Sequence, residues 1–181
     1  LHFAPRLGFA WSPFRNGKTT IRGGAGIFHQ WFGSDIFEET LRLNGFNQSD
    51  TVLTNPGYPD PFSTALLASQ FPPSIVRRSP SLQMPYIERA SIGMQRQFKD
   101  LMLMVDTRIE HDVHSFRVRN INTPVGLIRP DPFRGNILEI ESNANSTMKG
   151  FAINLSPAMG KGGRRIFWLA NYFLSKSVNE T

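Results

Sequence analysis

The sequence contains no cysteine and no long run of apolar residues, and each absence excludes a class of protein. Without cysteine the chain can form neither a disulfide nor a thiolate metal site, which suits an exported protein. No run approaches the roughly 18 apolar residues that a membrane-spanning helix requires. Disorder is also excluded, because 40% of the 181 residues are hydrophobic. A folded chain without a membrane helix therefore remains.

What the chain does contain favours strands and turns over helices. It has 15 Phe, 15 Gly and 13 Pro, which is typical of β-structure with many turns. It begins with Leu1, and it ends at Thr181 directly after a strand-like run. We therefore expect a fragment of a longer protein.

The charge balance is basic but scattered. Lys and Arg number 20 against 14 Asp and Glu, which gives a net charge of +6. The only adjacent basic pairs are Arg77-Arg78 and Arg164-Arg165, and no basic helix or aromatic-basic RNA motif is present. This distribution favours a solvated basic surface and predicts no nucleic-acid partner.

Residues 85–116 carry the clearest strand pattern. The charged connection Phe98-Lys99-Asp100 separates two extended segments, and the second segment alternates apolar and polar residues. One face carries Leu101, Leu103, Val105, Thr107 and Ile109. The other carries Met102, Met104, Asp106, Arg108 and Glu110. A period of two residues predicts strands rather than a helix, and the short connection predicts a hairpin.

Two further hairpins flank the central one. Residues 6–14 and 19–32 are joined by the turn Asn16-Gly17, because both residues tolerate positive φ. Residues 149–155 and 165–175 are joined by a glycine-rich turn at 159–163. Three glycines in the second strand, Gly23, Gly24 and Gly26, fit a curved sheet or the close approach of another element.

The segments between the hairpins are long and broken by proline. Residues 33–84 and 117–146 lack a regular period. Within the first segment we expect a short helix capped by Asp35, with Glu38 three residues on and Gly45 as its stop. Thr51-Val52-Leu53 is a candidate short strand. Loops of this length are more often functional than structural.

The connections alternate between short and long along the chain. Short ones lie at 15–18, 98–100 and 159–163, and long ones at 33–84 and 117–146. A β-sandwich gives no reason for this alternation, whereas an outer-membrane barrel has short periplasmic turns and long outside loops. The pattern predicts an all-β fold, an antiparallel transmembrane β-barrel fragment with about six long strands in three hairpins and long extracellular loops. Candidate members of an interfacial aromatic girdle are Trp11, Trp31, Trp168 and Tyr172.

Several motifs in sequence order carry a family resemblance. They are FAPRLGFAW at 3–11, NGKT at 16–19, IRGGAGIF at 21–28, PY at 85–86, SIGMQRQ at 91–97, RNIN at 119–122 and NY at 171–172. Together they resemble the barrel of Oar-like TonB-dependent outer-membrane receptors, which are abundant in acidobacteria and often carry a carboxypeptidase-regulatory-like N-terminal domain. The chain departs from the family at 107–115, where a Tyr-Val-Gly-Ser-Arg-Gly-like segment is typical.

The resemblance implies a location in the cell outer membrane of a Gram-negative-type bacterium. It also implies that residues 1–181 are part of one barrel domain, while the plug and N-terminal domains lie outside this chain. The complete protein would bind and import an unidentified solute, for example an oligosaccharide, a peptide or a metal chelate. Its implied partners are outer-membrane lipid, its own plug domain and, through the plug, the TonB complex.

The polar face of the central hairpin supplies the candidate lumen-facing residues. If the apolar face meets lipid, these side chains point into the lumen, where charges of mixed sign pair across strands or against a plug. We favour structural pairing over solute binding for them. The candidates are Arg89, Ser91, Gln95, Gln97, Asp106, Arg108 and Glu110.

Other motifs do not support catalytic or metal chemistry. His111 and His114 point to opposite faces of a continuous strand, so one ion could not easily bind both. The segment 16–19 resembles the end of a phosphate-binding loop, but Ser12 stands where that loop needs glycine, and two strands flank it. No Asp, Ser and His are brought together as a triad. We therefore predict no enzyme, no metal and no cofactor. The alternative function is a soluble secreted β-sandwich that acts as a binding or adhesion module.

Overall fold

The computed structural model describes residues 3–31, 33–48, 56–61, 73–158 and 167–180. The chain divides into two compact units. The first contains residues 1–30, 84–115 and 143–181, and the second contains 31–83 and 116–142. Among the described residues, no helix has both the length and the apolar character needed to cross a membrane.

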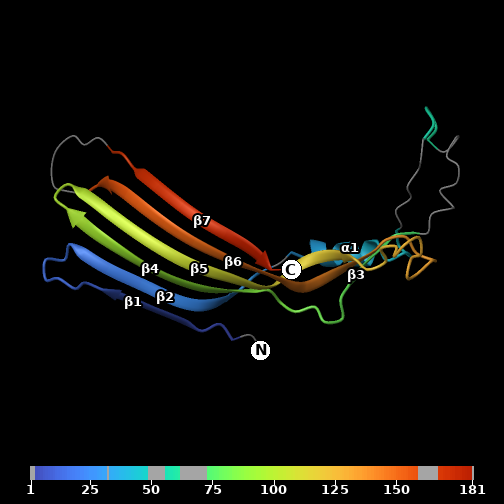
Figure 1. The fold of residues 1–181 in the computed structure, drawn as a ribbon, viewed down its shortest axis with the longest axis horizontal. Coiled ribbons are helices and arrows are strands. Elements are labelled where there is room, and N and C mark those ends of the chain that lie inside the picture. The colour runs from blue at the N-terminus through green and yellow to red at the C-terminus, as the bar shows by residue number, and fades with distance from the viewer. Residues whose placement is uncertain (1–2, 32, 49–55, 62–72, 159–166, 181) are drawn as a thin grey trace. The chain divides into compact units, whose positions relative to one another are not determined.

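The first unit is built from long strands that follow one another side by side in chain order (Figure 1). The first strand pairs antiparallel with the second, the second with the third, the third with the fourth and the fifth with the sixth. The three predicted hairpins are therefore confirmed. The strands are β1 (Arg6–Trp11), β2 (Thr19–His29), β4 (Tyr86–Phe98), β5 (Leu101–Asn120), β6 (Ile137–Pro157) and β7 (Ala170–Glu180).

Short turns close two of these hairpins. At the β1–β2 turn the backbone N–H of Gly17 donates to the Phe14 carbonyl at 3.1 Å, and Gly17 has a φ of 64°. Asn16 does not share this positive φ, contrary to expectation; its side-chain oxygen instead accepts the backbone N–H of Lys18 at 3.0 Å. At the β4–β5 turn, Lys99 has a φ of 46°.

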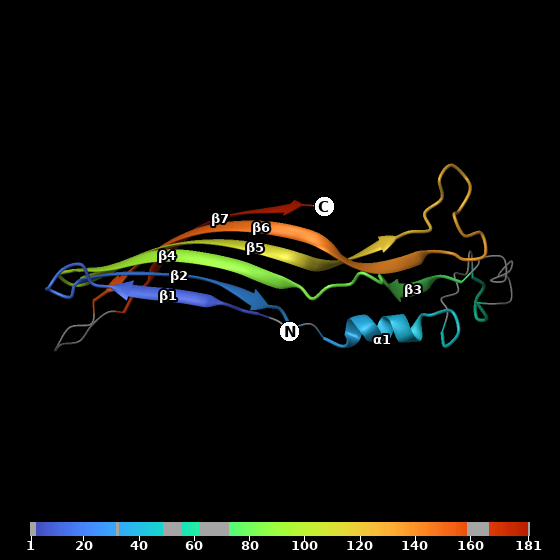
Figure 2. The same ribbon diagram turned by 90° about the horizontal axis from the view of Figure 1, so that it is seen from below.

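The second unit contains α1 (Asp35–Arg42) and β3 (Ile75–Arg78), which lie near each other in Figure 2. β3 runs parallel to the start of β6 and pairs with residues 137–140. Buried apolar side chains of this unit come from the paired strands: Val76, Ile137 and Ile140. The predicted strand at Thr51-Val52-Leu53 lies outside the described residues.

The predicted short helix is confirmed, but its start differs. Ser34 is the N-cap rather than Asp35, and no side-chain hydrogen bond caps the helix. Asp35 is instead the first helical residue, where its negative charge favours the helix N-terminus. The helix ends before the predicted stop: Leu43 is its C-cap, and Gly45, with a φ of 85°, lies two residues farther on.

The predicted long loop at 117–146 is wrong at both ends. β5 continues to Asn120 and β6 begins at Ile137, so the connection spans only 121–136. The sequence misleads here because buried carboxylates interrupt the apolar pattern of β6. Glu139 and Glu141 are 8% and 5% exposed, and arginines from neighbouring strands neutralise them.

The last strand also has different bounds from those predicted. β7 begins at Ala170, and the described residues 167–169 before it are not in a strand. It then continues to Glu180, whereas the sequence pattern ended at Ser175. Residues 176–180 form this polar end, and their pairing with residues 145–149 of β6 holds it in the sheet.

The apolar side chains of the first unit are largely exposed. Leu7 is 80% exposed, and Trp11 and Leu174 are 59% and 58% exposed. A soluble protein rarely leaves so many large apolar side chains uncovered on one surface. The β-sandwich alternative is wrong, because the described strands form one sheet whose apolar face has no second sheet packed against it.

Candidate functional site

The polar face of the first unit carries an ion pair across three strands. The register places Gly93 opposite both Arg22 and Asp106, so these three residues share one face. The Arg22 Nη2 atom lies 3.6 Å from Asp106 Oδ1. A Cβ atom at position 93 would collide with the Asp106 carboxylate. The missing side chain of Gly93 therefore makes room for this bridge.

A second cluster forms farther along the same face. Arg89 Nε lies 3.0 Å and Arg108 Nε lies 3.6 Å from Glu110 Oε1. The Glu110 side chain is 12% exposed, whereas those of Arg89 and Arg108 are 43% and 48% exposed. One shielded carboxylate thus holds two arginines whose other donors remain open to solvent.

Aromatic rings hold the arginines in place from the side. The guanidinium carbon of Arg6 lies 4.4 Å from the centroid of the Phe28 ring, and that of Arg89 lies 5.3 Å from the same centroid. Arg108 approaches the Phe173 ring at 5.8 Å. Such stacking restrains a guanidinium without using its hydrogen-bond donors.

The predicted site residues did not include Arg6, Arg22, Phe28 or Phe173. Each lies on the polar face by alternation, which was a usable signal. Their proximity to the central hairpin depends on the pairing of β2 with β4 and of β6 with β7, which follows from tertiary structure.

A cavity of about 410 Å³ opens beside this cluster. Its lining includes Arg89, Ser91, Asp106, Arg108 and Phe173. These groups offer guanidinium donors, a hydroxyl, a carboxylate and a ring face. The arrangement can bind a polar solute or an acidic protein segment through hydrogen bonds and stacking.

The structure brings together most, but not all, of the predicted polar residues. Arg89, Asp106, Arg108 and Glu110 take part in the ion pairs, and Ser91 lies opposite Arg108 in the register. The two glutamines lie nearer the short turn. Gln95 Nε2 contacts Met102 Sδ at 3.4 Å, and Gln97 Nε2 donates to the Lys99 carbonyl at 3.3 Å.

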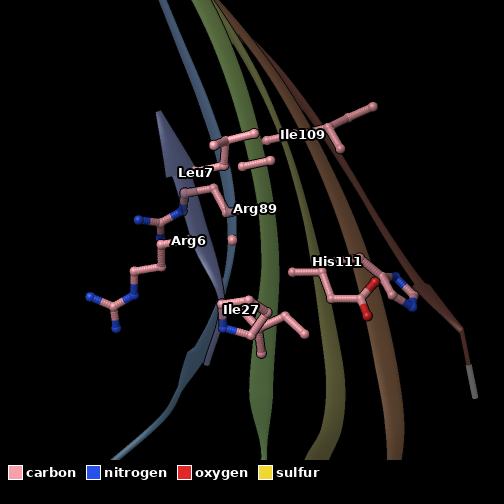
Figure 3. Close-up of a pocket in the computed structure, with 11 residues that line it drawn as sticks. Arg6, Leu7, Ile27, Arg89, Ile109 and His111 are labelled. Atoms are coloured by element: carbon pink, nitrogen blue, oxygen red, sulfur yellow. The ribbon is translucent and has the colours of Figure 1, made fainter. Parts of the chain in front are cut away.

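The opposite face is apolar across the same strands. Register pairs on it include Ile92 with Thr107 and Met94 with Val105. A hollow of about 510 Å³ on β1, β2, β4 and β5 is lined mainly by small and aliphatic residues. Figure 3 shows Arg6 and Arg89 projecting to one side of these strands, with Ile109 and His111 on the other.

The candidate girdle residues are all exposed, and the three that belong to the first unit do not share one level. Trp11 ends β1 at the short-turn end, and Trp168 precedes β7 at the same end of its hairpin. Tyr172 lies within β7, opposite Ile153. Trp31 belongs to the second unit and is 96% exposed.

The two histidines of β5 have separate partners. His111 Nδ1 lies 3.0 Å from the Thr147 hydroxyl, while the His114 ring packs edge-on against Tyr86 at a centroid distance of 5.6 Å. His114 has a φ of 59°, which interrupts the alternation of side chains along the strand. Within the described ranges, no group of three or more His, Asp or Glu side chains could hold a metal ion.

The second unit has a separate polar cluster. The Glu141 carboxylate accepts hydrogen bonds from Arg119 Nε at 2.8 Å and from Arg117 Nε at 3.4 Å. The hydrogen bond and the charge of Glu141 raise the pKa of Arg119 above its ordinary value. These hydrogen bonds tie the end of β5 to the start of β6.

Long antiparallel strands with an ion-paired polar face and an exposed apolar face define a segment of an outer-membrane β-barrel. The family described as outer membrane beta barrel domain matches residues 1–181, so the chain belongs to this family. It is a barrel segment that resides in the outer membrane.

Solved outer-membrane transporters share this fold. The outer membrane transporter YddB from Escherichia coli matches with a TM-score of 0.64 and 14% identity, over 96% of this chain and 20% of that chain. The FrpB iron transporter from Neisseria meningitidis matches with a TM-score of 0.50 and 9% identity, over 97% of this chain and 19% of that chain. The chain thus spans about a fifth of the length of these transporters. None of the curated proteins compared with it matches significantly.

Proposed function

We propose that this chain forms part of the barrel wall of a TonB-dependent receptor that imports a solute across the outer membrane. The observation that carries the proposal is the division of the same strands into an ion-paired polar face and an exposed apolar face. In a barrel of this class the polar face lines the lumen and the apolar face meets lipid. The similarity to solved transporters supports this orientation.

In this orientation the arginine cluster, formed by Arg22, Arg89 and Arg108, faces the lumen. Arg22, Arg89 and Arg108 outnumber the carboxylates of Asp106 and Glu110, which leaves one excess positive charge. Such a surface suits contact with an acidic part of the plug domain or with a polar solute in transit. An oligosaccharide, a peptide and a metal chelate remain the candidate solutes, and TonB would act through the plug.

The girdle assignment is part of the same proposal. Trp11 and Trp168 lie at the short-turn end of their strands, where the periplasmic interface would be. Tyr172 lies within β7, away from the short-turn end, and in this proposal it contacts lipid between the two interfaces. Trp31 stays a girdle candidate in the second unit.

This chain contains no cysteine, so single cysteines can be introduced here as labelling sites once any cysteine elsewhere in the complete protein has been replaced. Ser91 and Ile92 are neighbours in β4 that point to opposite faces, so Ser91→Cys and Ile92→Cys form a matched pair for spin labelling. In the complete protein in lipid vesicles, we expect the label at 91 to collide with a water-soluble nickel relaxant and the label at 92 to collide with oxygen. The reverse result, or equal accessibility to both, would show that the faces are assigned wrongly.

Transport needs its own test. Cells expressing the complete protein should accumulate one member of a panel of oligosaccharides, peptides and metal chelates, and deletion of TonB should stop that accumulation. The double replacement Arg89→Gln with Arg108→Gln should weaken uptake, while Arg15→Gln in the β1–β2 turn should not. Uptake that continues at the same rate without TonB would contradict energised import.

A further inference from the structure

Two lysines lie directly opposite each other on the apolar face of the first unit. The register pairs Lys149 of β6 with Lys176 of β7, and both residues are exposed. The next pairs on the same face are Phe151 with Leu174 and Ile153 with Tyr172. A pair of like charges thus borders an apolar surface.

Neither lysine forms an ion pair among the described residues, and Glu180 of the same face lies four residues beyond Lys176 in β7. None of the ion pairs in that part of the chain involves Lys149 or Lys176. The next two residues paired on the same face, toward the C-terminal end of β7, are Thr147 and Val178. Like charges directly opposite each other destabilise a ladder, so an external anion would be stabilising here.

The position of the pair along the strands matches a lipid headgroup. Lys149 lies eight residues before Pro157, the last residue of β6. At about 3.4 Å per residue and a tilt of about 40°, this separation corresponds to roughly 21 Å across the membrane. The apolar band of such a barrel is about 25 Å tall. The two ammonium groups can therefore reach the interface at the long-loop end.

We propose that Lys149 and Lys176 bind the phosphate of an outer-leaflet lipid whose acyl chain lies along Phe151, Leu174 and Tyr172. This inference rests on the proposed lipid-facing orientation of the apolar face. Two ammonium groups side by side suit a phosphate monoester, which has two negative charges and enough acceptor oxygens for both. The site is distinct from the arginine cluster, which occupies the opposite face of the sheet.

Lipid retention gives a direct test. The complete protein would be placed in phosphatidylcholine nanodiscs containing phosphatidic acid, and the bound phosphatidic acid would be counted by native mass spectrometry. About 1 kcal/mol per surface lysine corresponds to about fivefold in affinity. We therefore expect retention to fall about fivefold for Lys149→Gln or Lys176→Gln and about thirtyfold for both. Lys18→Gln, which removes a turn lysine, is the matched control and should have little effect.

Two outcomes of the retention experiment would overturn the proposal. Unchanged retention in the double variant is one. Displacement of phosphatidic acid by millimolar inorganic phosphate is the other, because it would identify a free-anion site rather than a lipid site.

Stability provides a readout that a purely structural role would not produce. In pure phosphatidylcholine, Lys176→Gln should raise the melting temperature, because it removes the repulsion from Lys149. With phosphatidic acid present, the same variant should lower it relative to the unmodified protein. The same sign of change in both lipids would contradict the proposal. Spin labels at 91 and 92 report the orientation separately, so failure of the lipid site and failure of the proposed function are distinguishable.

Discussion

At the scale of single residues, Asn122 organises the loop between β5 and β6. It is fully buried, and its side-chain amide donates to the carbonyls of Asp131 at 2.9 Å and Gly135 at 2.8 Å. Its side-chain oxygen accepts the backbone N–H of Asp131 at 2.7 Å. One side chain thus replaces the backbone ladder that an irregular loop lacks.

Asn122→Ala should therefore loosen this loop without disturbing the strands of the first unit. The buried partners lose their hydrogen bonds, which should lower the local stability of residues 121–136 by about 2–4 kcal/mol. Hydrogen exchange of the complete protein would show this as faster exchange confined to that segment. Thr123→Ala is the control, because Thr123 makes an exposed hydrogen bond to Asn120. Equal exchange in the two variants would contradict the organising role of Asn122.

At the scale of elements, β1 and β2 approach each other closely where Phe9 lies over Gly23. The register pairs the two residues directly. A Cβ atom at position 23 would come within 2.7 Å of the Phe9 ring and within 3.1 Å of the Ser91 carbonyl. The close approach expected from the glycines of this strand is therefore observed at this position.

Gly23→Ala should destabilise the protein by about 1–3 kcal/mol through overpacking. Combining it with Phe9→Ala should restore part of the loss, because the ring no longer obstructs the methyl group, although the Ser91 carbonyl still does. Urea unfolding of the complete protein in vesicles, followed by tryptophan fluorescence, would measure the coupling between the two changes. Gly8→Ala is a suitable control, since its nearest contact would be an ordinary 3.6 Å. Strict additivity of the double variant would argue against the clash.

At the scale of the whole molecule, the chemistry of each face of the strands determines whether that face meets lipid or water. The outer-membrane family and the exposed apolar surface place lipid against one of them. Val105 lies on the apolar face, midway along the outward-facing residues from Leu101 to Ile109, while its neighbour Met104 lies on the polar face.

Val105→Lys should destabilise the membrane-embedded protein by about 2–4 kcal/mol, because a lysine near the bilayer midplane loses its hydration. Met104→Lys should cost much less, since the polar face offers water and neighbouring polar groups. Unfolding free energies of the two variants in the same vesicles would make the comparison. A larger loss for Met104→Lys would invert the assignment of the faces.

The sequence by itself determined the three hairpins and the division of their strands into faces, but not β3 or the full lengths of β5 and β6. Alternation of side chains is a local property of extended backbone, so Leu101 to Glu110 could be assigned without knowledge of any partner strand. The pairing of strands within a hairpin followed from short turns such as Lys99-Asp100, whereas the pairing of β2 with β4 did not.

Only the tertiary structure decided which side chains meet. The contacts of Arg22 with Asp106 and of Arg6 with Phe28, and the facing of Lys149 with Lys176, depend on register between strands that a one-residue slip would reverse. The early start of β6 likewise required partners distant in sequence, because a buried Glu141 is stable in a strand only beside arginines that neutralise it. Local backbone geometry is encoded in neighbouring residues, whereas charge pairing is encoded in the fold.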